Sequence, residues 1–288
     1  MSRLAIAIAA AVAFIAPSCV KNTQDQGSAT RLLVVSVEPQ RNILEHLVDS
    51  TFTIRTLLSR DANPETFEPS MKERVRVDSA AIYFSTGVLP FEKVLENSAD
   101  GSRFVATSTG LDLIYDTHSH HDGSSHHGAP DPHYWSCIEG ARTIARNMAD
   151  ALSTSFPTDS SMISERLVAY EAHLDSLSSM ITGRLTGHQG DSFAVWHPSL
   201  SYFAREYGMN QISLGTEGKE MSAKGLKDAI DKAKNMGVKV FFFQKEFDSR
   251  QAISINDGIG STIVSIYPLD YDWEKQLILI ANEIAGAQ

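Results

Sequence analysis

The stretch from Asp159 to Leu185, DSSMISERLVAYEAHLDSLSSMITGRL, separates two halves of the chain. In both halves short apolar runs alternate with helical patterns. Apolar residues recur in it at intervals of three and four, which is the spacing of one buried face of an α-helix. These residues are Leu167, Tyr170, Leu174, Leu177 and Ile181. Neither proline nor glycine occurs before Gly183, so one unbroken helix is expected. Such a helix would connect two lobes more stiffly than a pair of loops.

Short apolar runs alternate with helical patterns on the N-terminal side of this helix. The expected strands are 32–37, 51–58, 80–85 and 104–107, with a helix over 39–49. Strands separated by helices form a parallel sheet that is covered on both faces. We therefore expect an N-terminal α/β lobe over residues 31–157.

The C-terminal side repeats the pattern. The expected strands are 192–196, 238–244 and 263–266, and the expected helices are 198–207, 223–236 and 273–285. A second α/β lobe over 188–288 would follow a connecting helix over 158–187. The predicted fold class is thus α/β, with two lobes, each a parallel sheet flanked by helices, joined by one long connecting helix.

The first residues have the pattern of an export signal. Arg3 precedes an apolar run, Leu4 to Ala16, that is too short to span a bilayer. The run leads to Cys19, which resembles the lipidated cysteine of a bacterial lipobox, although Ala16 stands where leucine is usual. We expect a signal peptide over 1–19, a lipid anchor at Cys19 and a polar tether over 20–30. Plain cleavage that leaves an ordinary cysteine is the alternative.

Charge and cysteine content exclude some classes of function. The 25 basic and 35 acidic residues give a net charge of -10, which argues against a nucleic-acid partner and favours a cationic ligand. Only Cys137 remains after Cys19, so the chain cannot build an intramolecular disulfide framework or a cysteine-type zinc site. A lone thiol in an exported protein is safest when buried, so we expect Cys137 in the core.

Histidines are concentrated between residues 118 and 133. The tract His118–His127 holds five of the ten histidines, and His133 follows in Asp131-Pro132-His133-Tyr134-Trp135. A tract without apolar residues is expected to be a solvated loop. Imidazole is the commonest protein ligand for Zn²⁺, so the pattern favours metal capture. The alternative is a surface loop whose histidines bind nothing.

Further candidate ligands lie in loops that follow predicted strands. In open α/β sheets the carboxyl edge of the strands is where ligands bind. The candidates are Glu65 after strand 51–58, His197 after 192–196, Glu246 after 238–244, and Asp270 after 263–266. Taken alone, a histidine here could be structural and a carboxylate could be a solvated surface acid.

Together these motifs resemble the zinc/manganese solute-binding lipoproteins of bacterial ABC importers, with matches from Leu33 nearly to the C-terminus. Asp131 to Trp135 matches the family's Asp-Pro-His-x-Trp, which supplies one metal ligand. The segment 197–208 matches its His-x-x-x-x-Tyr-Phe-x-x-x-Tyr-Gly, which supplies another. A His-rich loop ahead of the Asp-Pro-His motif is similar to that of the zinc-type members.

Two positions depart from the family pattern. Glu65 stands where the family's Pro-His-x-x-Glu-Pro-Ser loop has histidine, and Tyr267 stands where an aspartate precedes Pro-Leu. The resemblance therefore implies the ligands Glu65, His133 and His197, with Glu246, Asp270 or water as the fourth. We favour Glu246 because it directly follows a strand end. Two imidazoles and a carboxylate suit Zn²⁺, and the glutamate makes Mn²⁺ more tolerable.

The resemblance implies an extracytoplasmic solute-binding protein that is lipid-anchored through Cys19 on the periplasmic side of the cell envelope. It would capture Zn²⁺, or alternatively Mn²⁺, between its lobes and deliver the ion to an ABC transporter membrane permease. We expect a monomer without enzymatic activity, small lobe movements, and a His-rich loop that traps metal weakly. The alternatives are a metal-dependent hydrolase, although no His-Glu-x-x-His occurs, and a surface metal buffer or adhesin without a transporter.

Overall fold

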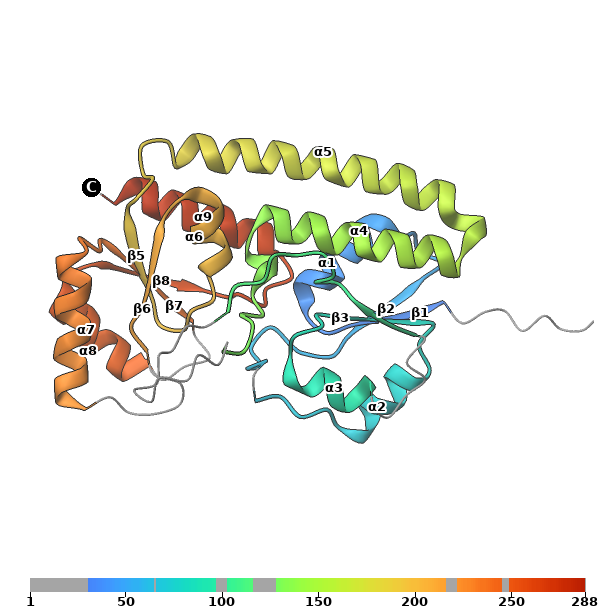
Figure 1. Cartoon of the computed structure of the whole chain (residues 1–288), viewed down its shortest axis with the longest axis horizontal. Helices are drawn as coiled ribbons and strands as arrows, with labels where there is room; N and C mark the ends of the chain where they lie inside the picture. Colours follow the sequence, from blue (N-terminus) through green and yellow to red (C-terminus); the bar gives the residue numbers. More distant parts are fainter. Residues whose placement is uncertain are drawn as a thin grey trace, which may run out of the picture.

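The computed structural model describes residues 31–64, 66–96, 103–115, 128–215, 222–244 and 249–287. In this part of the chain two four-stranded parallel sheets lie side by side, and one long helix runs along both (Figure 1). The arrangement confirms the predicted α/β fold class with two lobes and a long connecting helix. None of the described helices is long and apolar enough to cross a membrane.

The first sheet has the strand order β2-β1-β3-β4, and all its pairs are parallel. Its strands are β1 (Leu32–Val35), β2 (Thr53–Thr56), β3 (Ile82–Ser85) and β4 (Phe104–Ala106). The central strands β1 and β3 are mostly buried because helices cover both faces. One face carries α1 (Glu38–Leu47) and α4 (Ile138–Ser155), and α2 (Met71–Asp78) and α3 (Pro90–Glu96) lie on the other (Figure 1).

The second sheet has the order β6-β5-β7-β8 and is also parallel. Its strands are β5 (Ser192–Val195), β6 (Asn210–Ser213), β7 (Val240–Gln244) and β8 (Thr262–Ile266). Successive side chains point to opposite faces. Ala194, Phe241 and Phe243 therefore pack with α7 (Ala223–Asn235) and α8 (Ser249–Ile259). Phe193, Val195 and Phe242 join the cluster that contains α6 (Ser201–Tyr207) and α9 (Trp273–Gly286).

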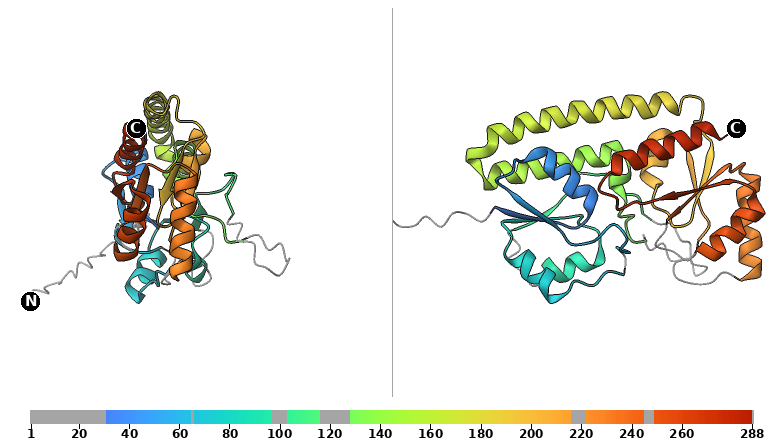
Figure 2. Two further views of the ribbon diagram at one scale, coloured as in Figure 1. Left: turned by 90° about the vertical axis from the view of Figure 1, so that its left-hand side faces the viewer. Right: turned by 180° about the vertical axis from the view of Figure 1, so that it is seen from behind.

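That cluster is continuous with the core of the first lobe. It extends from β1 and α1 through α4 and the long helix α5 (Ser160–Arg184) to α6 and α9. The buried residues of α5 are Ile163, Tyr170, Leu174, Leu177 and Ile181, and the sequence spacing predicted the last four. A single turn, η3 (Pro157–Asp159), joins α4 to α5, which then follows both lobes along one side (Figure 2). The two lobes therefore share one hydrophobic core.

Direct hydrogen bonds also connect the lobes. The indole N–H of Trp135, in the 3₁₀ turn η2 (Tyr134–Ser136), donates to the carbonyl of Pro268 at 2.8 Å. The Tyr202 hydroxyl donates to the carbonyl of Asp131 at 2.9 Å. Trp273 donates its indole N–H to the side chain of Asn42 at 3.1 Å. These bonds and the shared core hold the two sheets in one relative arrangement.

Some elements were not assigned from the sequence. They are α2, α3, α4, α8 and β6. β6 is an edge strand with one buried residue, Ile212, so alternation does not reveal it. α4 was missed although its buried residues Ile138, Ala141, Ile144, Met148 and Leu152 follow the three- and four-residue spacing of a helix. Cys137 is buried at the start of α4, as predicted.

Candidate metal centre

The Asp-Pro-His motif places His133 in the buried approach to α4. Its backbone N–H donates to Asp131 Oδ1 at 2.9 Å, and its ring Nδ1 lies 2.8 Å from the same oxygen. Burial raises the pKa of Asp131, but hydrogen bonds from His133 outweigh burial and leave that pKa below its ordinary value. An ionised Asp131 takes the Nδ1 proton as a hydrogen bond. The other ring nitrogen, Nε2, is then the one able to bind a metal ion.

His197 enters the same region from the second lobe. It follows β5 and the buried Trp196, at the carboxyl edge of the second sheet. Its imidazole meets that of His133 edge to face, with ring centroids 5.2 Å apart and planes at 71°. Two histidines that are 64 residues apart in sequence, one from each lobe, are thus brought together as predicted.

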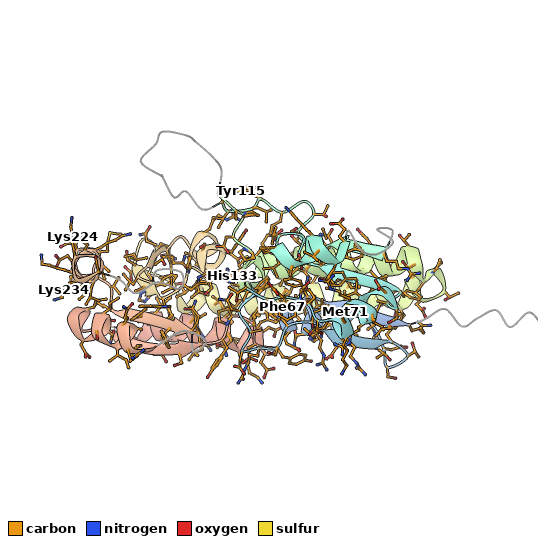
Figure 3. All side chains as sticks on the ribbon, turned by 90° about the horizontal axis from the view of Figure 1, so that it is seen from below. Phe67, Met71, Tyr115, His133, Lys224 and Lys234 are labelled. Atoms are coloured by element: carbon orange, nitrogen blue, oxygen red, sulfur yellow. The ribbon has the colours of Figure 1, made fainter. Side chains whose placement is uncertain are left out.

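Both imidazoles line a cavity of about 240 Å³. Its other walls are Val88, Leu89, Pro90, Ala129, Pro130, Asp131, Pro132 and Pro198. Seen from below, His133 lies where the two lobes meet (Figure 3). A mainly apolar, proline-rich wall limits both water access and backbone movement around the two rings.

A buried carboxylate fixes one wall of this cavity. Glu92 accepts hydrogen bonds from the backbone N–H groups of Thr86, Gly87 and Leu89, at 2.7, 2.9 and 3.2 Å. The hydroxyls of Thr86 and Ser36 also donate to it. Burial is the main cause of a raised pKa at Glu92. The Tyr134 hydroxyl donates to the carbonyl of Thr86 at 3.0 Å, so the wall is tied to the residue after His133.

In the described part of the chain, the other predicted ligands are not seen at the two histidines. Glu65, Glu246 and the tract His118–His127 lie outside the described residues. Asp270 is paired with the Arg60 guanidinium at 3.3 Å, and the same guanidinium lies 4.5 Å from the ring centroid of Tyr267. In the part of the chain that the structure describes, no group of three or more His, Cys, Asp or Glu side chains is placed to hold a metal ion.

Three supporting residues were not identified from the sequence. Asp131 holds the ring of His133, and Glu92 fixes one wall of the cavity. Gln244, the last residue of β7, is hydrogen-bonded to His197. For Asp131 a signal existed, because a carboxylate next to a metal-binding histidine commonly orients the ring. For Gln244 the signal is an amide at the end of the apolar run Phe241-Phe242-Phe243. Glu92 has no comparable signal, since its role depends on burial.

A family model described as "Zinc-uptake complex component A periplasmic", ZnuA, matches residues 33–276. The chain belongs to the ZnuA family. The resemblance inferred from the sequence motifs is therefore confirmed.

Solved structures and curated relatives agree with membership of the ZnuA family. A crystal structure of ZnuA has a TM-score of 0.80 and 26% sequence identity, covering 89% of this chain and 98% of that one. The Mn²⁺ complex of FpvC from Pseudomonas aeruginosa has a TM-score of 0.76 at 21% identity, covers 89% of this chain and 97% of that one, and supports the fold alone.

Two curated relatives are named for zinc and manganese. The zinc-binding protein AdcA of Streptococcus pyogenes serotype M6 is 24% identical over 265 residues, covering 85% of this chain and 52% of AdcA. The manganese ABC transporter substrate-binding lipoprotein PsaA of Streptococcus mitis is 22% identical over 265 residues, covering 87% of this chain and 83% of PsaA. The chain thus spans about half the length of AdcA and most of the length of PsaA.

Proposed function

We propose that the chain is an extracytoplasmic receptor that captures a divalent metal ion between its lobes and delivers it to an ABC permease. The observation that carries this proposal is the meeting of His133 and His197. One comes from each lobe, their rings are 5.2 Å apart, and both line one cavity in a chain of the ZnuA family. A ligand bound by both rings stabilises the arrangement in which the lobes face each other.

The proposed ligand set is Glu65, His133, His197 and Glu246. Glu246 lies two residues beyond β7, and β7 is the hydrogen-bonded neighbour of β5, whose end leads to His197. Parallel neighbours end at the same edge of a sheet, so the second-lobe ligands come from one edge. Asp270 is a weaker candidate because its carboxylate is paired with Arg60. Water would fill the fourth position if Glu246 does not.

The donor chemistry favours Zn²⁺ over Mn²⁺. Two imidazoles and one or two carboxylates are borderline donors that suit tetrahedral zinc, whereas manganese prefers more oxygen ligands. The names of the relatives include both metals: AdcA is named for zinc and PsaA for manganese. We propose Zn²⁺ as the main cargo and Mn²⁺ as a tolerated one.

The proposed location is the periplasmic side of the cell envelope, with Cys19 lipidated and residues 20–30 as the tether. Support comes from the export-signal pattern and from relatives that are named lipoproteins, AdcA of Streptococcus pneumoniae and PsaA. The proposed partners are the metal ion, the membrane and the permease, and the receptor acts as a monomer. We propose a binding protein rather than a hydrolase, because the matching family is described as a zinc-uptake component and the sequence has no His-Glu-x-x-His motif.

Elemental analysis and competitive Zn²⁺ titration of the purified chain test this function. One tightly bound ion per chain is expected. His133→Ala and His197→Ala should each weaken its binding by more than ~10- to 100-fold, the loss typical when a residue hydrogen-bonded to a metal ligand is removed. Tight binding that survives both substitutions would place the receptor site elsewhere. Hydrolysis of a substrate that depends on His133 would favour the enzyme alternative.

A further inference from the structure

Gln244 ends β7 with a side chain that is fully buried. Its Oε1 accepts a hydrogen bond from the backbone N–H of His197 at 3.1 Å, and its Nε2 donates to the backbone carbonyl of His197 at 2.8 Å. Nε2 also donates to the Ser199 hydroxyl at 2.6 Å. A primary amide has one oxygen acceptor and two N–H donors, so each of its polar groups is used.

We propose that Gln244 is a positioning residue that fixes the aim of the His197 imidazole at the bound metal ion. This inference rests on the proposed function. Both backbone polar groups of His197 are held by one amide, and the carbonyl also accepts from the Ser199 N–H at 2.8 Å across Pro198. The proline ring restricts the backbone that follows. The Cβ of His197 therefore has a set position, from which the imidazole is directed at the ion.

The chemistry of Gln244 is matched to this task. A buried amide is costly unless its groups are hydrogen-bonded, and an apolar residue would continue the run Phe241-Phe242-Phe243 at no such cost. Glutamine instead directs its polar groups to His197 and to Ser199, which is itself fully buried. Asp131 plays the corresponding part in the first lobe, where it holds the backbone N–H of His133.

Gln244 also links the two proposed ligands of the second lobe. It is two residues before Glu246 in the chain, and its side chain holds residue 197. The backbone segments that carry His197 and Glu246 are thus joined by a short covalent and hydrogen-bonded path. A shift of either segment can therefore be passed to the other through this side chain, beside the backbone pairing of β5 with β7.

The test compares zinc affinity in the full chain and in Gln244→Met, which keeps the side-chain length and removes the hydrogen bonds. Gln244→Met should raise the Kd for Zn²⁺ by about 10- to 100-fold, the usual effect of losing an outer partner of a metal ligand. Gln211→Met is a matched control. Gln211 accepts from the Leu200 N–H at 2.7 Å and donates to the Ser201 hydroxyl at 2.9 Å, so it holds the same loop beyond His197. That control should lower thermal stability and change the Kd far less than Gln244→Met does, since Gln211 reaches the site only through the hydrogen bond of Ser201 to Asp131.

A double substitution separates positioning from general stability. In a His197→Ala background, Gln244→Met should weaken zinc binding no further, because residues that act through one group are not additive. Should Gln244→Met not fold, Gln244→Leu serves in its place, since it also removes the hydrogen bonds to both backbone groups of His197.

Three outcomes would overturn the proposal. One is an unchanged Kd in the Gln244 variant while His197→Ala weakens binding, and this outcome leaves the proposed function standing. Another is an equal loss of affinity in Gln211→Met, which would show that zinc affinity depends on the order of the whole loop after His197 and not on the position of His197 itself. The third is full zinc affinity in His197→Ala, which overturns the proposed function as well.

Discussion

At the scale of single residues, the two imidazoles are oriented by different means. Asp131 holds the ring of His133 through Nδ1, and both side chains are only 4% exposed. Gln244 holds His197 through its backbone. His133 is therefore set in tautomer and direction through its ring, whereas His197 is positioned through its backbone.

The position of Glu65 gives the first prediction. If its carboxylate replaces the family's histidine as a ligand, Glu65→Ala should weaken zinc binding by at least ~10-fold with the fold intact. Glu65→His should restore binding and shift the preference from Mn²⁺ toward Zn²⁺, because imidazole is the softer donor. Competitive titration with both metals, together with circular dichroism, measures this. Zinc affinity in Glu65→Ala equal to that of the parent would make Glu65 a surface acid and leave His133 as the first-lobe ligand.

How well the sequence predicts the site depends on the residue. His133 and His197 were predicted because a motif and a strand end mark them, and the structure brings them together. Glu65 and Glu246 stay predictions, since both lie outside the described residues. The roles of Glu92 and Gln244 could not be predicted, because they follow from burial and from partners brought near by the tertiary fold.

At the scale of elements, the His-rich tract 118–127 is the segment whose contribution can be isolated. It lies between β4 and η2, and its removal leaves the Asp-Pro-His motif in place. Deleting it should abolish weak binding of additional ions and keep one tight site, because none of the proposed ligands of the tight site belongs to the tract. Isothermal titration with Zn²⁺ counts the sites. Loss of the tight site on deletion would contradict the inter-lobe model and make the tract the receptor.

The elements themselves were predicted unevenly. α5 was predicted from its spacing and β7 from its apolar run, and all five residues of β7 are buried. β6 was missed because an edge strand needs few apolar residues. Pro198 was expected to open the helix that follows β5, but α6 begins at Ser201, because Pro198 belongs to the hydrogen-bonded turn between His197 and Ser199.

At the scale of the whole molecule, α1, α5 and α9 meet where His46 stacks on Tyr170 with ring centroids 4.7 Å apart. Burial is the main cause that lowers the pKa of His46 below its ordinary value of 6.5, and His173 and Arg166 also lower it, against Glu274 and Glu45. The unfolded chain therefore binds this proton first as pH falls. Stability present above about pH 6.5 is lost as pH falls through the lower folded pKa.

His46→Gln should remove that part of the acid sensitivity. The melting temperature of the parent is expected to fall more steeply than that of the variant between pH 7 and 5, measured without metal. Parallel curves would mean that His46 titrates alike in the folded and unfolded chain.

Anchoring is the second prediction at this scale. Cys19→Ser should release the protein into the soluble fraction or leave its signal peptide unprocessed, because serine cannot take the thioether-linked lipid. Fractionation of membranes, with mass spectrometry of the mature N-terminus, detects either result. Unchanged membrane association would show that Cys19 is not the anchor.

The core that runs through α5 into both lobes has a consequence for how the loaded state is recognised. We expect a molecule held along its length by one core and by inter-lobe hydrogen bonds to change its outline little when an ion enters. The proposed permease would then have to recognise the loaded form by the two positive charges of the ion, added to a chain of net charge -10 where both lobes are within reach. Recognition of the loaded form would then be electrostatic and local, so we expect it to weaken as the salt concentration rises.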